Sequence, residues 1–222
     1  MSKQDMSDEQ IRDAASASMA SGEHIRERVR ELTLQALQSR RLDFPAMGQV
    51  LKSLTEGISV GAERGGQDAR RALSEAFAGM DQAMSKAAQA SSLALKELAS
   101  RGREFSDTDL KQGLERMRQM EHGFLDSVRQ VSQSASGVVK SEWQDVMAHA
   151  QRAGTDTGKV ISQTARELSA SMGASLSEGA IVGVEAARQF GERLAAMTSG
   201  ILAGMSEALR LDKDTDKNEK KA

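Results

Sequence analysis

The chain has 222 residues and a mass of 23.9 kDa, which suits one ordinary domain or two small ones. Its 30 basic and 32 acidic residues leave a formal net charge of −2, so no overall basic charge favours a nucleic-acid partner. Cysteine is absent, which excludes disulfides, thiol catalysis and thiolate metal sites and suits a reducing compartment. The N-terminus is polar, and no apolar run reaches the length of about 18 residues that spans a membrane, so we expect a cytoplasmic protein.

The composition favours helices. Pro45 is the only proline, and the chain is rich in alanine, serine, glycine and methionine. We predict an all-α fold, an elongated antiparallel bundle of three to four long amphipathic helices. The bundle should form a single unit over residues 7–211, with disordered ends at residues 1–6 and in the charged tail 212–222.

The first predicted helix spans about residues 7–41. Ser7 and Gln10 have the spacing of a capping box at its start. The stretch RERVRELTLQALQSRR, residues 26–41, alternates arginine with glutamate and indicates a solvated face with salt bridges. Contact with anionic lipid or nucleic acid is the alternative interpretation of this stretch.

The second predicted helix spans about residues 45–103 and begins at Pro45, since proline fits the first position of a helix. The third spans about 107–153, after a restart signal at SDTD, and the fourth about 156–211. In the second helix the apolar residues follow a heptad-like spacing typical of a coiled coil. They are Leu73, Phe77, Met80, Met84, Ala87, Ala94 and Leu98.

Two segments of the chain repeat each other. LTEGISVGAE begins at Leu54 and LSEGAIVGVE at Leu176, and residues 54–73 align with 176–195 at eight identical positions of twenty. Both carry a row of small residues at i, i+4 steps. The first row is Gly57, Gly61, Gly65 and Ala69, and the second is Gly179, Gly183, Ala187 and Gly191.

A row of small residues on one side of a helix lets a second backbone approach closely. Each glycine costs about 0.5–1 kcal/mol relative to alanine in a helix, so a close contact must offset the cost. We predict that the rows pack the second helix against the fourth within one bundle. A self-association face or docking groove is the alternative, and added flexibility is a third interpretation.

The stretch GTDTGKV, residues 154–160, resembles a phosphate-binding loop but has three residues between its glycines instead of four. We interpret it as helix punctuation, in which Gly154 ends one helix and Thr155 or Asp156 caps the next. The three histidines are far apart, and no catalytic motif occurs. We therefore predict no enzyme activity, no metal, no cofactor, no small-molecule substrate and no nucleic-acid partner.

Several apolar residues are candidates for contact with a hydrophobic surface. Trp143 is the only tryptophan, and it suits either a core anchor at the bundle end or an anchor at a lipid or polymer surface. The stripe in the second helix is the other candidate, because amphipathic helices bury their apolar faces on hydrophobic phases. The proposed surface-binding residues are Leu73, Phe77, Met80, Met84 and Trp143.

Two long segments, LDFPAMGQVLKSLTEGISVGAE and AFAGMDQAMSKAAQASSLALKELASRGREFSDTDLKQGLERMRQMEHGFLDSV, carry a family resemblance. The chain resembles a bacterial family of uncharacterised all-helical proteins, a domain-of-unknown-function family, over about residues 25–210. This resemblance implies a helical fold and brings no established activity, cofactor or site. A looser, compositional similarity is to phasins, helical proteins that coat polyhydroxyalkanoate granules.

Together these observations lead to one functional expectation. The chain should be a non-enzymatic helical interaction or surface-coating protein, phasin-like, on a granule or membrane surface, and a homo-oligomer. The alternative is a self-associating structural or stress-related coiled-coil scaffold that uses no lipid or polymer surface.

Overall fold

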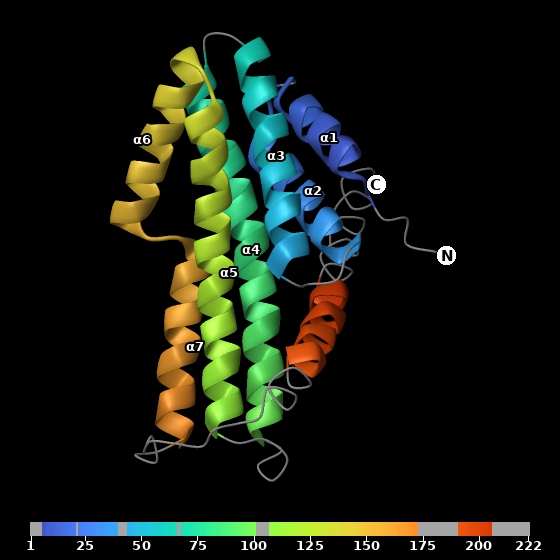
Figure 1. Ribbon diagram of the computed structural model, residues 1–222, viewed down its shortest axis with the longest axis vertical. Helices are drawn as coiled ribbons and strands as arrows, with labels where there is room; N and C mark the ends of the chain where they lie inside the picture. Colours follow the sequence, from blue (N-terminus) through green and yellow to red (C-terminus); the bar gives the residue numbers. More distant parts are fainter. Residues whose placement is uncertain are drawn as a thin grey trace, which may run out of the picture.

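The computed structural model describes residues 6–20, 22–39, 44–65, 68–100, 107–172 and 191–205, which are helical apart from short connections and contain no β-strand (Figure 1). This confirms the all-α prediction. The helices are α1 (Asp8–Ala20), α2 (Ile25–Ser39), α3 (Phe44–Gly65), α4 (Ala69–Ser100), α5 (Asp107–Ser134), α6 (Gly137–Ala153) and α7 (Asp156–Met172). A further helix covers residues 191–205, here called helix 191–205. Of the predicted disordered ends, 1–6 and 212–222, residues 1–5 and 212–222 lie outside the described residues.

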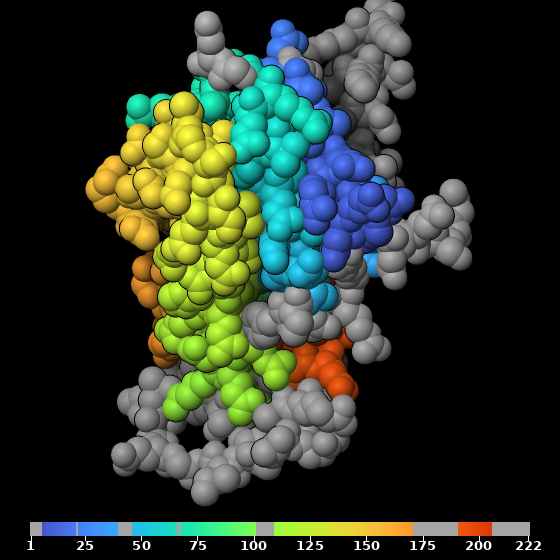
Figure 2. All heavy atoms as spheres, turned by 45° about the horizontal axis from the view of Figure 1, so that its top comes forward, coloured from blue at the N-terminus to red at the C-terminus, as the bar shows by residue number. Residues whose placement is uncertain are grey.

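The helices form two layers along the long axis of the molecule. Helices α1, α3 and α5 lie side by side in one layer (Figure 2), and α2, α4 and the α6–α7 pair form the other. Asp8 and Arg12 of α1 contact Gln49 and Glu56 of α3, respectively, so these neighbours run parallel. From α1 to α6, helices that follow each other along the chain run in opposite directions, whereas α6 and α7 run in the same direction (Figure 1). The predicted antiparallel bundle is therefore not confirmed in this form.

The prediction of three to four long helices is wrong, because the chain turns back more often than expected. The predicted helix 7–41 is divided into α1 and α2. Gly22 and His24, between them, have φ angles of 66° and 52°, a left-handed conformation that ends a right-handed helix. Ser7 and Gln10 do form the predicted capping box at the start of α1, with hydrogen bonds of 2.9 and 3.2 Å.

Two of the other predicted helices are also divided at glycines. The predicted helix 45–103 stops at Gly65, the first of two consecutive glycines, and resumes as α4. The predicted helix 107–153 is divided at residues 135–136, and Gly137, at the start of α6, has φ 55°. The fourth predicted helix does begin at Asp156, as α7, but residues 173–190 lie outside the described part of the chain.

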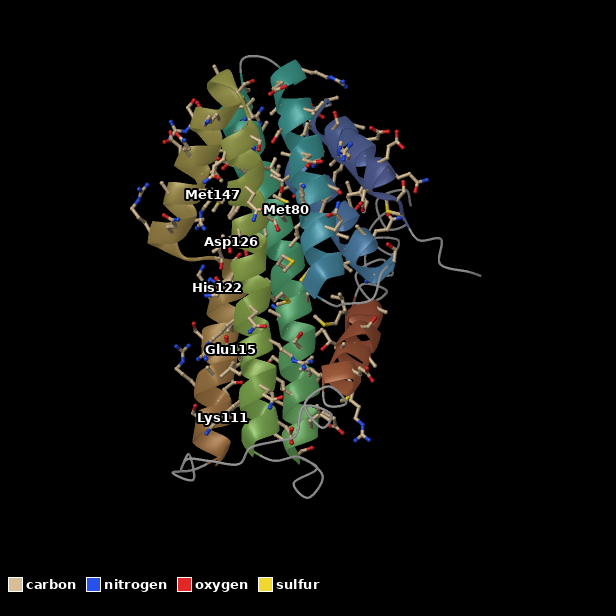
Figure 3. All side chains as sticks on the ribbon, viewed as in Figure 1. Met80, Lys111, Glu115, His122, Asp126 and Met147 are labelled. Carbon is tan, nitrogen blue, oxygen red and sulfur yellow. The ribbon has the colours of Figure 1, made fainter. Side chains whose placement is uncertain are left out.

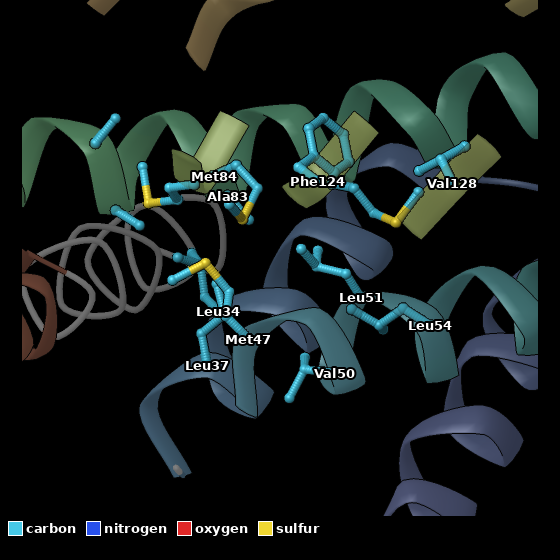
Figure 4. Close-up of a cluster of buried hydrophobic side chains, with 14 of the residues drawn as sticks. Leu34, Leu37, Met47, Val50, Leu51, Leu54, Ala83, Met84, Phe124 and Val128 are labelled. Atoms are coloured by element: carbon cyan, nitrogen blue, oxygen red, sulfur yellow. The ribbon is translucent and has the colours of Figure 1, made fainter. Parts of the chain in front are cut away.

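The core lies between the two layers. In the close-up of Figure 4, Leu51 and Leu54 of α3 lie near Phe124 of α5 and Met84 of α4, and all four side chains are fully buried. Phe77 of α4 stacks on Phe124, with 5.3 Å between the ring centroids. These contacts hold the two layers together at the middle of the molecule.

Helix 191–205 lies below α3 in Figure 1, at the end of α2. Leu194 and Leu202 are buried in the common core, and the Gln38 side chain of α2 donates a hydrogen bond to the Leu202 carbonyl at 3.3 Å. Gly191, at its start, faces the guanidinium of Arg116 on α5. Helix 191–205 therefore covers the part of the bundle's side that α3 does not reach.

Candidate functional site

The first glycine row forms a close contact between α3 and α1. A Cβ atom at Gly57 would collide with the backbone carbonyl oxygen of Arg12 and lie 2.8 Å from the Ala15 Cβ. At Gly61 it would lie 2.6 Å from the Met19 Cβ and 2.8 Å from the Ser16 carbonyl oxygen. Neither distance leaves room for a side chain, so the two glycines let the α1 backbone lie directly on α3.

The rest of the first row does not take part in this contact. No atom lies within 4 Å of a Cβ built at Gly65, the last residue of α3, and Ala69 belongs to α4. The described partner of Gly57 and Gly61 is α1, whereas the predicted partner, the second row, lies mostly outside the described residues. Gly179, Gly183 and Ala187 of the second row lie outside the described residues.

An ion pair beside the glycine contact fixes its register. The Arg12 guanidinium of α1 lies 3.0 Å from the Glu56 carboxylate, one residue before Gly57. Glu56, Gly57 and Gly61 each have an identical counterpart in the second repeat, at Glu178, Gly179 and Gly183. Three residues of α3 that contact α1 are therefore preserved in the repeat.

The five residues proposed for surface contact all lie in the core. Leu73, Met80, Met84 and Trp143 are fully buried, and Phe77 is 8% exposed. In the closed bundle none of them is available to a lipid or polymer surface. The interpretation of the α4 stripe as a surface-binding face therefore requires the bundle to open.

Trp143 of α6 is a core anchor and not an exposed anchor. Its indole Nε1–H donates a hydrogen bond to the Ser59 hydroxyl of α3 at 2.9 Å, and both residues are buried. A buried indole without a partner would lose a hydrogen bond that water supplies in the unfolded chain. The Ser59 hydroxyl in turn donates to the Thr55 carbonyl at 2.8 Å. The pair joins the two layers near the upper end of the molecule.

The stretch that resembles a phosphate loop begins α7, with Thr155 and Thr157 buried and Gly154, Asp156 and Lys159 exposed. Gly154, with φ 75°, ends α6, and its amide donates to the Ala150 carbonyl at 2.9 Å. The Thr155 hydroxyl accepts a hydrogen bond from the Gly158 amide at 2.9 Å. These contacts confirm the interpretation of the stretch as helix punctuation.

A carboxylate from another helix occupies the position where a phosphate would lie. Asp81 of α4, 7% exposed, accepts hydrogen bonds from the amides of Asp156 and Thr157 at 2.7 and 3.1 Å and from the Thr157 hydroxyl at 2.7 Å. The negative carboxylate also complements the positive end of the α7 dipole. From α5, Glu121 accepts a hydrogen bond from the Thr155 hydroxyl. The start of α7 is therefore bound by the protein's own acids.

Sequence reasoning missed Asp81 and the role of Glu121. Both acids stand within apolar stripes, Asp81 next to Met80 and Glu121 next to Met120. A charge among core residues is itself a signal of a buried partner, because an unpaired buried charge is costly. The partner could not be identified from sequence, since it is a helix start more than 30 residues away.

Below this cap, α4 and α7 continue as a polar seam. The Thr164 hydroxyl donates to the Ser92 hydroxyl at 2.8 Å in a buried position, and Lys96 pairs with Glu167 at 2.5 Å near the surface. The hydrogen bond from Lys96 lowers the pKa of Glu167 below its ordinary value of 4.5, and a second hydrogen bond from Gln163 adds to this effect. The seam fixes the register of α7 on α4.

The lowered pKa of Glu167 predicts a pH-dependent contribution to stability. A carboxylate with a depressed folded pKa stabilises the fold above its unfolded value of 4.5 and loses that contribution as the pH falls through the folded value. We expect Glu167→Gln to lower the melting temperature slightly at pH 7 and to match the parent as the pH falls well below 4.5. Melting curves between pH 7 and pH 3 measure this difference. Glu115→Gln, in an exposed pair with Arg118, is the control, and a difference that grows on acidification would contradict the prediction.

The outer face of α5 is polar and carries both signs of charge. Lys111, Glu115, His122 and Asp126 line it in Figure 3 and are exposed, while the labelled Met80 and Met147 are buried. In the basic stretch of α2, Arg26 binds Glu75 of α4 through two hydrogen bonds of 2.8 and 2.9 Å. Both observations fit solvated faces with local ion pairs.

The geometry defines an all-helical protein whose glycines, capped helix start and buried indole serve contacts between helices. No helix in the described ranges is both long and apolar enough to cross a membrane. The chain belongs to a family of unknown function, DUF6781, whose family model matches residues 1–211. This confirms the resemblance to a domain-of-unknown-function family. No curated protein and no solved structure matches the chain.

Proposed function

We propose that this chain is a non-enzymatic helical interaction protein that coats a hydrophobic surface, either a granule or a membrane. The single observation that carries the proposal is the buried face of α4. Alanine is the most frequent residue on this face, which also carries serines, the two methionines Met80 and Met84, and only three leucines. Buried alanine contributes little hydrophobic stabilisation, and methionine adapts to irregular surfaces. Such a core loses little stabilising free energy when a helix leaves it, and the helix regains apolar burial on a hydrophobic phase.

The buried polar residues of α4 support the same proposal. Ser85, Ser91 and Ser92 lie in the interior beside the alanines. A core that mixes hydroxyls with small apolar groups depends on closed hydrogen bonds more than on apolar area. Leu73, Phe77, Met80 and Met84 would reach a surface at a late stage, after the layers separate. A cytoplasmic location fits the cysteine-free composition.

The alternative is a self-associating scaffold that packs with itself and uses no lipid or polymer. The buried Trp143–Ser59 bond and the cap on α7 favour this alternative, because both make the closed bundle specific. Val138 on α6 is 65% exposed and would suit a contact with a second copy. Light scattering on the purified chain measures the homo-oligomer that both proposals include.

Co-sedimentation tests the coating proposal. The full chain is mixed with vesicles of dioleoylphosphatidylcholine and, separately, with hydrophobic polyester particles, and helicity is followed by circular dichroism. We expect the protein to sediment with at least one of the two surfaces at low and high salt. A chain that is fully helical and stays in the supernatant with both would leave the scaffold as the better proposal.

A further inference from the structure

Helix 191–205 differs from the other described helices in its charge. Its sequence is GERLAAMTSGILAGM, and after Glu192 and Arg193 no charged residue follows up to residue 205. Its most exposed positions in this stretch are the small residues Ala196, Gly200 and Gly204. Apart from Glu192 and Arg193, its exposed positions are uncharged, whereas the outer face of α5 carries charged side chains along its length (Figure 3).

The apolar side of this helix is only partly covered by the bundle. Leu194 and Leu202 are buried, whereas Met197, Ile201 and Met205 are partly buried and lie along one flank. In a helix these five residues share one face, at i, i+3, i+4 and i+7 steps. The apolar face is therefore wider than the strip that the bundle covers.

The contact that holds helix 191–205 includes an unfavourable element. The Thr198 hydroxyl lies in the buried strip between Leu194 and Leu202, and it has no hydrogen-bond partner among the described residues. A buried unpaired hydroxyl costs free energy that would be recovered when water reaches it. Docking of this helix is weakened by that cost, whereas the cap of α7 and the Trp143–Ser59 pair are fully bonded.

We propose that helix 191–205 leaves the bundle and inserts its apolar face into an uncharged lipid surface with loosely packed acyl chains, while α3–α6 stay closed. This inference rests on the coating function proposed above and names the segment that makes the contact. Charge identifies the lipid: helices that bind anionic lipid carry several lysines and arginines on the polar face, whereas this one has a single arginine, Arg193, next to Glu192, and otherwise serine, glycine and alanine. Its affinity must come from burial of Met197, Ile201, Leu194, Leu202 and Met205 alone.

Vesicle binding by variants of the full chain tests the assignment. With small vesicles of dioleoylphosphatidylcholine, Ile201→Glu should bind at least about tenfold more weakly than the parent, because it places a charge on the inserting face. Gly200→Glu is the matched control. No atom lies within 4 Å of a Cβ at Gly200, and the position points away from the bundle, so binding should stay within about twofold. Equal binding by Ile201→Glu and the parent would overturn the inference and leave the coating function standing.

A second variant keeps the folded bundle and changes only the docking. Thr198→Val removes the unpaired hydroxyl, so the helix should dock more firmly and bind vesicles about fivefold more weakly than the parent. Unchanged or stronger binding would overturn the inference. Circular dichroism of each variant without vesicles checks that the bundle is folded.

Lipid composition and the single tryptophan separate the remaining outcomes. Adding phosphatidylserine or raising the salt should change binding less than about twofold, and binding that requires anionic lipid would overturn the choice of lipid.

Brominated phosphatidylcholine should leave Trp143 fluorescence unquenched, because Trp143 stays buried. Quenching would show that the layers open, which overturns the inference and supports the coating function. Binding to polyester particles alone would overturn the lipid assignment, and binding to neither surface would overturn both proposals.

Discussion

Asp81→Ala is expected to lower the free energy of unfolding by about 3 kcal/mol, because it leaves the buried start of α7 without its acceptor. The carboxylate of Asp81 binds two backbone amides and the Thr157 hydroxyl, at distances of 2.7 to 3.1 Å. Hydrogen bonds to a charged group contribute more than neutral ones, and the two bonds from Thr157 are buried. Urea unfolding followed by circular dichroism measures the change.

Two further variants separate the charge of Asp81 from its geometry. Asp81→Asn keeps one acceptor oxygen and should lose about half as much stability as the alanine variant. Asp126→Ala is the matched control on the surface: its partner Arg129 is one helical turn away, and such pairs contribute less than about 0.5 kcal/mol. If Asp81→Ala behaved like Asp126→Ala, the cap would not hold α7. Hydrogen exchange should show the loss of protection first at residues 156–160.

The cap illustrates what the sequence can and cannot predict here. Composition and apolar spacing were sufficient for the all-α fold, and the Gly154–Thr155 boundary was predictable because local rules govern the ends of helices. The side chain that completes the cap comes from α4, 75 residues earlier. No local rule connects Asp81 with Asp156, so only the tertiary fold shows the pair.

The helix breaks were predictable in part. Gly65 and Gly66 stand together before Asp68, a common helix-capping residue, and that combination is a stronger stop than either glycine alone. The sequence interpretation placed no helix end between residues 45 and 103 and so joined α3 to α4. The parallel neighbours within each layer were not predictable, because apolar spacing indicates which face of a helix is buried but not which helix covers it.

The candidate surface residues also show that apolar spacing does not identify what covers a buried face. The stripe through Leu73, Phe77, Met80 and Met84 was correctly located on one face of a helix, and that face is buried in the bundle. An amphipathic face has the same sequence whether a neighbouring helix or a lipid covers it. Helix 191–205 received no separate interpretation at the sequence level, since its lack of charge becomes informative only when its exposed side is known.

The contact between α1 and α3 gives the second large expected effect. Gly57→Ala should destabilise the protein by about 1–2 kcal/mol even though alanine favours helices by about 0.5–1 kcal/mol over glycine. The new Cβ would meet the carbonyl oxygen of Arg12, a backbone atom that cannot rotate away, so α1 as a whole must shift. Gly57→Leu should displace α1 from α3. Thermal melting measures the stability, and hydrogen exchange over residues 8–20 measures the docking of α1.

Two other glycines of α3 set the scale for this effect. Gly48→Ala meets no atom within 4 Å and should stabilise the protein by about 0.5–1 kcal/mol, the ordinary gain of a helical alanine. Gly61→Ala should fall between the two, because its nearest obstructions, the Met19 Cβ at 2.6 Å and the Ser16 carbonyl oxygen at 2.8 Å, overlap the new Cβ less than the Arg12 carbonyl oxygen does at Gly57. We expect stability to decrease in the order Gly48→Ala, Gly61→Ala, Gly57→Ala. This order depends only on how closely α1 approaches each position. If Gly57→Ala stabilised the protein, α1 could not lie on this glycine row. The free-energy cost of placing glycines in α3 would then have no packing contact to offset it.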